Sequence, residues 1–286
     1  MTSAAPPRAG AGGFDAWKAA TLAILIILAL VFLAPTVGVL LSSIKSTRDI
    51  ALGNLWSMPN SVYLANYIEV LTNPAVHTYM LNTLLVAVPA TIGSIGLGIL
   101  AGYVFAKLPF RGSNLLFLVL VAGMFFPPQV ILIPLFRLFN GLGLIDTLWP
   151  VIIVHIGLGI PICTLLMRNF FATVPNALRE AAILEGANEW QVLTRVALPI
   201  SLPALAVLVT LQFTWIWNDF LWPLIFTQSD NKRTIMLGLV SLKGQYSVAW
   251  GVQGALSLIA TLPTLIVFLF FQRYFIKGMT MGAVKG

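Results

Sequence analysis

The chain has 286 residues, of which 59% are hydrophobic and only 9% are charged, and its mean hydropathy is +0.95. Soluble domains carry about 25% charged residues, so the composition excludes a soluble globular protein and indicates an integral membrane protein. The net charge of +7 does not indicate nucleic acid, because the basic residues are scattered rather than clustered on one face. One cysteine, Cys163, excludes an intrachain disulfide, and with only two histidines no metal site is expected.

The predicted elements are membrane spans joined by short polar loops. Residues 1–18 are predicted to be a disordered tail, and the rest a single transmembrane domain, residues 19–286. The first apolar run is too long for the apolar core of a signal peptide, and it reaches the roughly 20 residues that a span needs. The chain is therefore predicted to be all-α, with six spans near residues 19–44, 79–106, 112–136, 147–167, 201–226 and 252–273.

Prolines and glycines within these runs predict where the helices bend and where they pack closely. Four glycines along the second span, at positions 93, 96, 98 and 102, predict a helix that packs closely against others. Pro127, Pro128 and Pro134 predict a kink in the third span, and Pro161 predicts a break in the fourth.

A polar connector, at about residues 168–200, separates the fourth and fifth spans. Pro175 is placed to start a helix, and Gly186 is a natural stop for it. Asn188 with Gln191 forms a capping-box pattern for a second short helix, which Leu198-Pro199 is expected to end, and Pro203 falls in the first turn of the fifth span. Composition alone favours an amphipathic helix on the membrane surface over a docking element for a soluble partner.

The order of residues in this connector changes that preference. Glu180-Ala181-Ala182, Gly186-Ala187, Leu198-Pro199 and Pro203 together resemble the EAA loop of ABC importer permeases. Two departures, Glu185 for Asp and Val196 for Ile, are conservative. The resemblance implies that the connector is a coupling helix seated in a cleft of a separate ATP-hydrolysing subunit. It assigns that contact to Glu180, Ala181, Ala182, Glu185, Gly186 and Ala187.

The fifth span contains Trp215, Trp217, Asn218 and Asp219. An ionisable residue in a span usually faces the bundle interior or a cavity, and tryptophan rings suit sugar faces. The alternative is that Asp219 lies near the membrane–water interface within an aromatic belt, and the sequence favours neither interpretation over the other. His155 is expected to hydrogen bond between helices. The W-x-W-N-[DE]-F pattern also resembles permeases of the carbohydrate-uptake branch of these importers.

The last residues of the chain resemble the GLTAGAVKG ending of the same branch. In the maltose-type importer the smaller permease ends this way, and its tail reaches into the ATPase dimer. The resemblance assigns such a contact to Gly278, Thr280, Gly282 and Lys285 within the tail, residues 274–286; the alternative is a frayed end. It also assigns Gly244, Gln245 and Tyr246, in the last outer loop, to the solute-binding protein.

Orientation follows from the basic residues. Ten of the 16 Lys and Arg residues fall on the side of both termini and the polar connector, which places that side in the cytoplasm. No Walker A loop or nucleophile motif is found in the sequence, so the chain is expected not to be an enzyme.

The resemblance implies a subunit of a bacterial inner-membrane importer for a sugar or polyol. Its partners would be a second homologous permease, two ATP-binding subunits carrying ATP and Mg, and an extracytoplasmic solute-binding protein. The alternative class, an ion-coupled carrier, needs intramembrane carboxylates, and Asp219 is the one candidate in the sequence.

Overall fold

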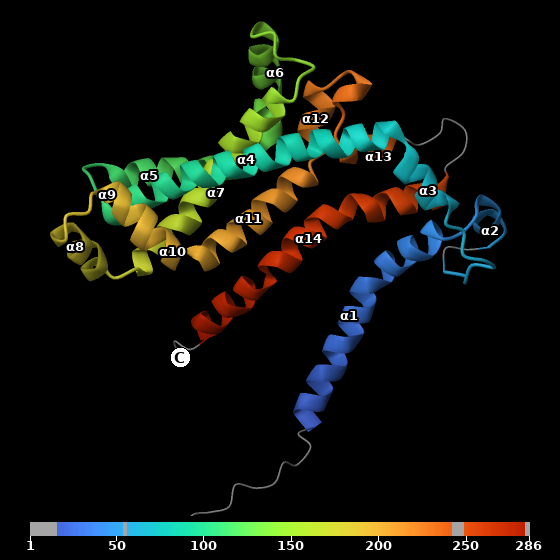
Figure 1. Cartoon of the computed structure of the whole chain (residues 1–286), viewed down its shortest axis with the longest axis horizontal. Coiled ribbons are helices and arrows are strands. Elements are labelled where there is room, and N and C mark those ends of the chain that lie inside the picture. Colours follow the sequence, from blue (N-terminus) through green and yellow to red (C-terminus); the bar gives the residue numbers. More distant parts are fainter. Residues whose placement is uncertain (1–15, 54–55, 242–248, 284–286) are drawn as a thin grey trace, which may run out of the picture. The chain divides into compact units, whose positions relative to one another are not determined.

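The computed structural model describes residues 16–53, 56–241 and 249–283, and all regular structure within these ranges is helical (Figure 1). The elements in chain order are α1 (Ala16–Ser43), α2 (Thr47–Leu52), α3 (Ala65–Thr72), α4 (Pro74–Lys107), α5 (Ser113–Ala122), η1 (Gly123–Phe125), η2 (Pro128–Ile131), α6 (Leu132–Gly141), α7 (Trp149–Thr173), α8 (Asn176–Leu184), α9 (Glu189–Gln191), η3 (Val192–Ala197, a π-helix), α10 (Leu198–Ile200), α11 (Leu202–Trp217), α12 (Leu221–Phe226), η4 (Asp230–Lys232), α13 (Ile235–Ser241) and α14 (Trp250–Ala283).

The prediction of an all-α membrane protein is confirmed. Within the described residues four helices, α1, α4, α7 and α14, are long and apolar enough to cross a membrane, and two bent helix pairs raise the number to six if each pair is one span. The pair Ser113–Phe125 and Pro128–Gly141 falls on the predicted third span, whereas the pair Glu189–Ile200 and Leu202–Trp217 joins the end of the predicted connector to the first part of the predicted fifth span.

The third span is broken rather than merely kinked. Its two halves meet at 92°, with Phe126 and Pro127 extended at ψ 127° and 126°. The residue before a proline is disfavoured in helical conformation, so consecutive prolines at 127 and 128 stop the helix. Pro134 does not contribute, contrary to expectation, because it lies in the first turn of α6, where no intrahelical N–H is needed.

The prediction that Pro161 breaks the fourth span is wrong. α7 runs without interruption from Trp149 to Thr173, and Arg168 therefore belongs to the helix and not to the connector. Half of the apolar window of α7 is buried, so packing on neighbouring helices supports the helix across a missing backbone donor.

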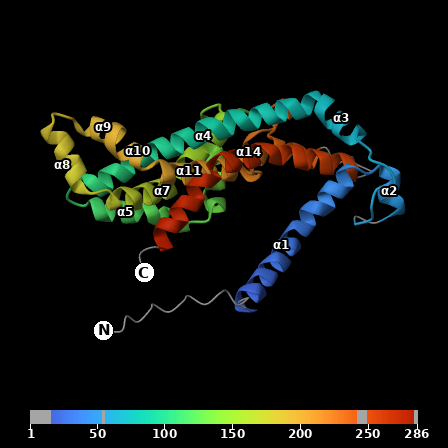
Figure 2. The ribbon, with the colours of Figure 1, turned by 60° about the horizontal axis from the view of Figure 1, so that its bottom comes forward.

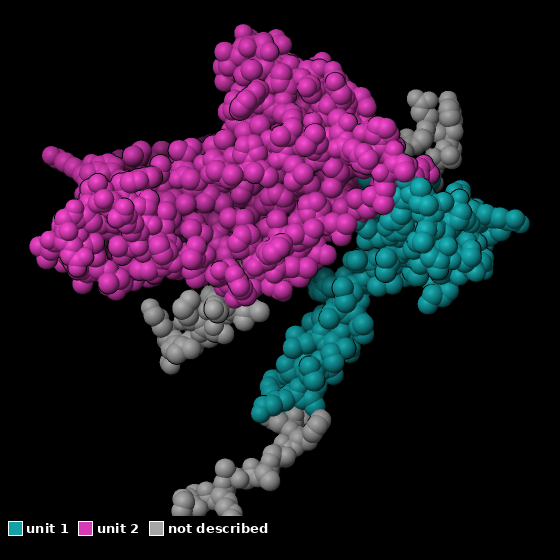
Figure 3. All heavy atoms as spheres, viewed as in Figure 1, with its two compact units in different colours: residues 1–68, 249–258 teal, residues 69–248, 259–286 magenta. Residues whose placement is uncertain are grey.

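The chain divides into two compact units, residues 1–68 with 249–258 and residues 69–248 with 259–286, coloured separately in Figure 3. Within the first unit the end of α1 is tied to α3. Asn66 donates to the carbonyls of Ser43 and Lys45 at 2.8 and 2.9 Å, and the hydroxyls of Ser43 and Tyr67 lie 2.7 Å apart. The sequence had indicated one domain after the tail.

The second unit is built on the pair α4 and α7, with α11 alongside (Figure 2). Two glycines of α4 permit the close approach. A Cβ at Gly98 would lie 2.3 Å from Cys163 Cβ, and one at Gly102 would lie 2.8 Å from Met167 Cβ. The predicted packing role of these two glycines is confirmed, whereas a Cβ at Gly96 would meet open space.

Side-chain hydrogen bonds attach loops of the second unit to the two ends of α4. At its N-terminal end Tyr79 donates to Asp230 and Asn82 donates to the carbonyls of Asn231 and Arg233, at 2.8 to 2.9 Å. At its C-terminal end Lys107 donates to Val174 O at 2.5 Å. The hairpin after the second span and the connector after the fourth thus lie at the same end, as the predicted order of spans requires.

Candidate functional site

The polar connector folds as two short helices joined at a glycine corner. α8 ends in a Schellman motif, in which Ala187 N bonds to Ala182 O and Gly186 N bonds to Ile183 O, both at 2.9 Å. Gly186 has φ +90°, a conformation that side chains with a Cβ rarely adopt. The predicted glycine stop is confirmed, and Pro175 stands one position before the helix, as its N-cap.

The second arm begins as the sequence predicts and ends later. Asn188 and Gln191 form a reciprocal capping box with both hydrogen bonds at 2.9 Å. The prediction that Leu198-Pro199 ends this helix is wrong, because the helical path continues through η3 and α10 to Ile200. Leu198 N bonds to Leu193 O, five residues back, so the turn is already widened where Pro199 lacks its donor. The chain then bends by 80° into α11, where Pro203 lies in the first turn as predicted.

An ion pair joins the two short helices of the connector, α8 and α9. The Arg179 guanidinium is bonded to both carboxylate oxygens of Glu189, and Tyr103 of α4 donates to Glu189 Oε2 at 2.8 Å. The hydrogen bond from Arg179 holds the pKa of the Glu189 carboxyl below its usual value. This brace joins the connector to α4, and the corner at Gly186 is exposed.

The connector has an inner and an outer face. Ala182 and Ala187 pack against a buried cluster that includes Met167, Phe171 and Leu193. Their small size is therefore used for packing within this chain, and their contact with a partner stays a prediction. The exposed residues include Glu180, Ala181, Glu185, Gly186 and Leu184, the last with 88% of its surface accessible.

Asp219 lies where the fifth span breaks between α11 and α12. Its carboxylate accepts from Leu221 N at 3.0 Å and Trp222 N at 3.3 Å, so it caps α12. His155 Nε2 of α7 lies 3.0 Å from Asp219 Oδ2, which confirms the expected interhelical role of His155. Asp219 thus has a structural role that explains its place in an apolar segment.

The structure separates the four residues of the expected substrate pathway. Trp215, Asn218 and Asp219 line one hollow of about 860 Å³. Trp217 does not join them, because it is 1% exposed and its indole N–H donates to Ala260 O at 2.9 Å. Trp217 is a core residue of α11, and a solute would reach it only after repacking.

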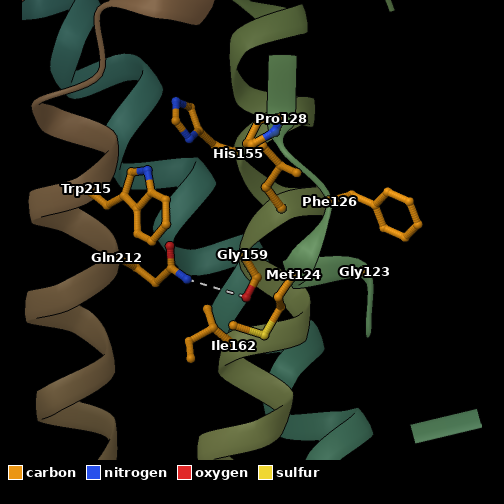
Figure 4. Close-up of a pocket in the computed structure, with 10 residues that line it drawn as sticks. Gly123, Met124, Phe126, Pro128, His155, Gly159, Ile162, Gln212 and Trp215 are labelled. Atoms are coloured by element: carbon orange, nitrogen blue, oxygen red, sulfur yellow. Dashed lines mark hydrogen bonds between the residues drawn. The ribbon is translucent and has the colours of Figure 1, made fainter. Parts of the chain in front are cut away.

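A second cavity, of about 110 Å³, opens where η1, α7 and α11 meet (Figure 4). Its walls include Met124, His155, Ile162, Gln212 and Trp215. Figure 4 shows Gln212 and Trp215 projecting from α11 toward α7, with the amide nitrogen of Gln212 bonded to Gly159 O. The break of the third span supplies one wall, as irregular backbone within a membrane is expected to do.

Two functional features were missed from the sequence. Gln212 carried a usable signal, because it is an amide inside the apolar run of α11, but it was not singled out. The Tyr103–Glu189 contact had no local signal, since 86 residues separate the two.

Several predicted residues have no described contacts. Gly244, Gln245, Tyr246 and Lys285 lie outside the described residues. α14 continues as a helix to Ala283, so Gly278, Thr280 and Gly282 lie on a helical extension of the sixth span rather than in a separate tail. The assignments to a binding protein and to an ATPase stay predictions.

Comparison with known proteins identifies the family. The family described as binding-protein-dependent transport system inner membrane component matches residues 94–281. The probable ABC transporter permease protein PH1036 of Pyrococcus horikoshii is 36% identical over 256 residues, which cover 89% of this chain and 93% of the relative. The arabinooligosaccharides transport system permease protein AraQ of Bacillus subtilis is 32% identical over 276 residues, 96% of this chain and 98% of the relative.

A solved structure has the same fold. It belongs to a bacterial ABC transporter involved in the import of the acidic polysaccharide alginate, and it matches with a TM-score of 0.79 and 25% identity over 91% of this chain and 96% of that chain. The family match covers more than half of the chain, and it includes the connector, the broken fifth span and most of α14. The chain therefore belongs to the inner-membrane components of binding-protein-dependent transport systems, the permease subunits of ABC importers.

Proposed function

We propose that this chain is the smaller-type permease of a bacterial ATP-driven importer for a sugar or related polyol. AraQ serves arabinooligosaccharides and the structural neighbour imports alginate, which supports a carbohydrate. The chain would form half of the translocation pathway beside a second, homologous permease. Two ATP-binding subunits, which would carry ATP and Mg, and an extracytoplasmic solute-binding protein would complete the assembly.

The observation that carries the proposal is the outer face of the connector. Leu184 is 88% exposed on a short polar helix outside the spans, next to the exposed carboxylates of Glu180 and Glu185. The inner face is already braced by Arg179, Glu189 and the two alanines. An exposed apolar side chain next to two carboxylates, on a helix that is held to the rest of the chain, suits docking in a cleft of a soluble partner.

The proposed mechanism is alternating access. ATP-driven closure of the partner subunits moves the two docked connectors, and the brace to Tyr103 passes that displacement to α4. Because α4 packs along α7, a tilt of α4 changes the cavity between α7 and α11. The chain itself contributes position and movement, and its partners contribute the hydrolysis.

An ion-coupled carrier is the less favoured function. It needs a carboxylate that can take up an ion during transport. Asp219, the candidate, accepts two backbone hydrogen bonds and contacts His155, so it is committed to holding α12.

The function is tested by assembly and transport. The chain is co-expressed with the ATPase, second permease and solute-binding protein of its transport system, purified, and placed in proteoliposomes. We expect ATP hydrolysis to rise with a sugar-loaded binding protein and labelled sugar to accumulate. Transport driven by an ion gradient without ATP would overturn the proposal.

Orientation is a separate part of the proposal. Both termini and the connector should face the cytoplasm. In a Cys163→Ser background, Asn188→Cys should react with an impermeant thiol reagent only after the membrane is opened. Labelling from outside intact cells would reverse the orientation.

The last nine residues and the loop after α13 are proposed to contact partners. Deleting Gly278–Gly286 should leave the spans inserted and reduce ATPase coupling. Replacing residues 243–246 with a Gly/Ser linker should reduce transport driven by the binding protein. Full transport by either variant would remove the corresponding contact.

A further inference from the structure

The amide of Gln212 has a fixed orientation and an unused acceptor. The side chain belongs to a residue that is only 5% exposed, and its Nε2 lies 3.4 Å from Gly159 O and 3.3 Å from Cys163 Sγ. A carbonyl oxygen can only accept, so the nitrogen must face α7 and the oxygen must face away from it. No hydrogen bond to Gln212 Oε1 is found among the described residues.

The unused oxygen belongs to the lining of the cavity in Figure 4. In that view it points toward Trp215, away from Gly159. The oxygen is not among the buried polar atoms without a partner in the described residues, so it is open to the cavity, and a hydroxyl that enters the cavity can donate to it. The cavity of about 110 Å³ exceeds the roughly 10–15 Å³ needed for a single water, so it has room for part of a solute.

The other walls indicate what kind of solute fits. Trp215 is 69% exposed, and its indole offers a broad apolar face next to the amide oxygen. Met124 and Ile162 add apolar surface, and His155 adds a polar ring edge. The lining contains no Asp, Glu, Lys or Arg. Apolar walls with a few convergent polar groups suit a neutral solute that has both C–H faces and hydroxyl donors.

We propose that Gln212, with Trp215 and His155, forms a subsite for one neutral sugar ring during passage through this subunit. Gln212 Oε1 accepts a sugar hydroxyl, and Trp215 covers the apolar face of the ring. The subsite rests on the proposed function, since it names the chemistry of the solute that the permease moves. It adds Gln212 to the expected pathway residues and leaves out Trp217, which is buried.

The test measures sugar delivered per ATP hydrolysed by the assembled importer in proteoliposomes, with saturating sugar-loaded binding protein. Gln212→Met keeps the size of the side chain and removes the acceptor, and Trp215→Leu removes the ring from an exposed position. We expect each variant to lower this ratio about 3- to 10-fold, the scale of one hydrogen bond. ATP hydrolysis stimulated by the binding protein should stay near wild type, because the connector is untouched.

Two further variants separate binding from packing. Gln129→Met makes the same change at an exposed residue of η2 that does not line the cavity, and it should transport normally. Gln212→Glu in its protonated form can donate to Gly159 O and present an acceptor oxygen to the cavity, so it should retain more transport than Gln212→Met at low pH.

The outcomes that overturn the subsite are distinct from those that overturn the function. A wild-type ratio in both Gln212→Met and Trp215→Leu refutes the subsite while sugar import by the wild type stands. If Gln212→Met and Gln212→Glu lose thermal stability and ATP hydrolysis together, the amide only packs α11 on α7, and the subsite is again refuted. If no sugar-loaded binding protein stimulates the wild type, the proposed function fails and the subsite fails with it.

Discussion

A carboxylate lies next to a helix end in two regions of the chain: Glu189 in the connector, and Asp219 at the break between α11 and α12. The two carboxylates differ in their exposure and in their partners. Glu189 is 37% exposed and pairs with Arg179, whereas Asp219 is 12% exposed and is bonded to His155 and two backbone N–H groups. A charge pair at the surface contributes little free energy, because water solvates both partners when the pair opens. A polar group inside a membrane protein has no such alternative, so every bond at Asp219 matters.

The difference indicates how the two regions work. The ion pair of the connector contributes little to the free energy of unfolding of this chain, so the important interactions of its outer face should be those made with a partner. The break at Asp219 is fixed by this chain alone. Four substitutions test whether the two regions differ in this way.

The largest effect is expected for Glu180→Ala on the outer face of the connector. Removing one member of a charge pair buried against the ATPase would cost about 2–5 kcal/mol of binding. Purified complexes should lose ATPase subunits or their stimulated hydrolysis, while the chain itself folds normally. Glu69→Ala, at an exposed glutamate of α3, is the matched control. Wild-type assembly and hydrolysis in Glu180→Ala would leave only the surface-helix interpretation.

Asp219→Ala should be the most damaging change within the chain. It removes the cap of α12 and leaves His155 and two N–H groups without their acceptor, a loss of about 2–4 kcal/mol in the free energy of unfolding. Thermal unfolding of the purified complex measures it. Asp219→Asn retains one acceptor oxygen and should lose less. Equal melting temperatures for wild type and Asp219→Ala would show that water replaces the carboxylate.

Gly186→Val should lower the free energy of unfolding by about 1–2 kcal/mol, because a side chain with a Cβ is strained at φ +90°. A steric clash does not add to this cost, since a Cβ would meet no atom within 4 Å. The corner would then turn differently, and transport should fall more than stability. Gly96→Val adds the same side chain where there is also open space, but in an ordinary helical conformation, and is the control. Full coupling in Gly186→Val would show that the corner can adapt.

Glu189→Gln should have the smallest effect, about 0.2–1 kcal/mol, as for other partly exposed pairs. Because the pKa of Glu189 is lowered in the folded state, the contribution of the pair is present above the usual value of 4.5 and is lost as the pH falls through the lowered pKa. The difference in melting temperature between wild type and Glu189→Gln should therefore be larger at pH 7 than at pH 3. A difference that grows on acidification would contradict the assigned brace.

Features that depend on a few neighbouring residues could be predicted from the sequence alone. Gly186 stops α8, Asn188 and Gln191 cap the second arm, and Pro127-Pro128 interrupts the third span, because each acts through its own backbone. The apolar runs likewise determined the membrane class, and the motif order of the connector indicated the family.

The directions in which the side chains face depend on the packing of the helices and could not be predicted from the sequence. The spans are apolar on all sides, so periodicity does not distinguish a buried face from an exposed one. Trp217 packs inward while Trp215 lines a cavity, and Ala182 packs on its own chain beside an outward Glu180. The bonds that fix these choices join residues far apart in sequence, such as Gln212 to Gly159 and Trp217 to Ala260, and no local preference encodes them.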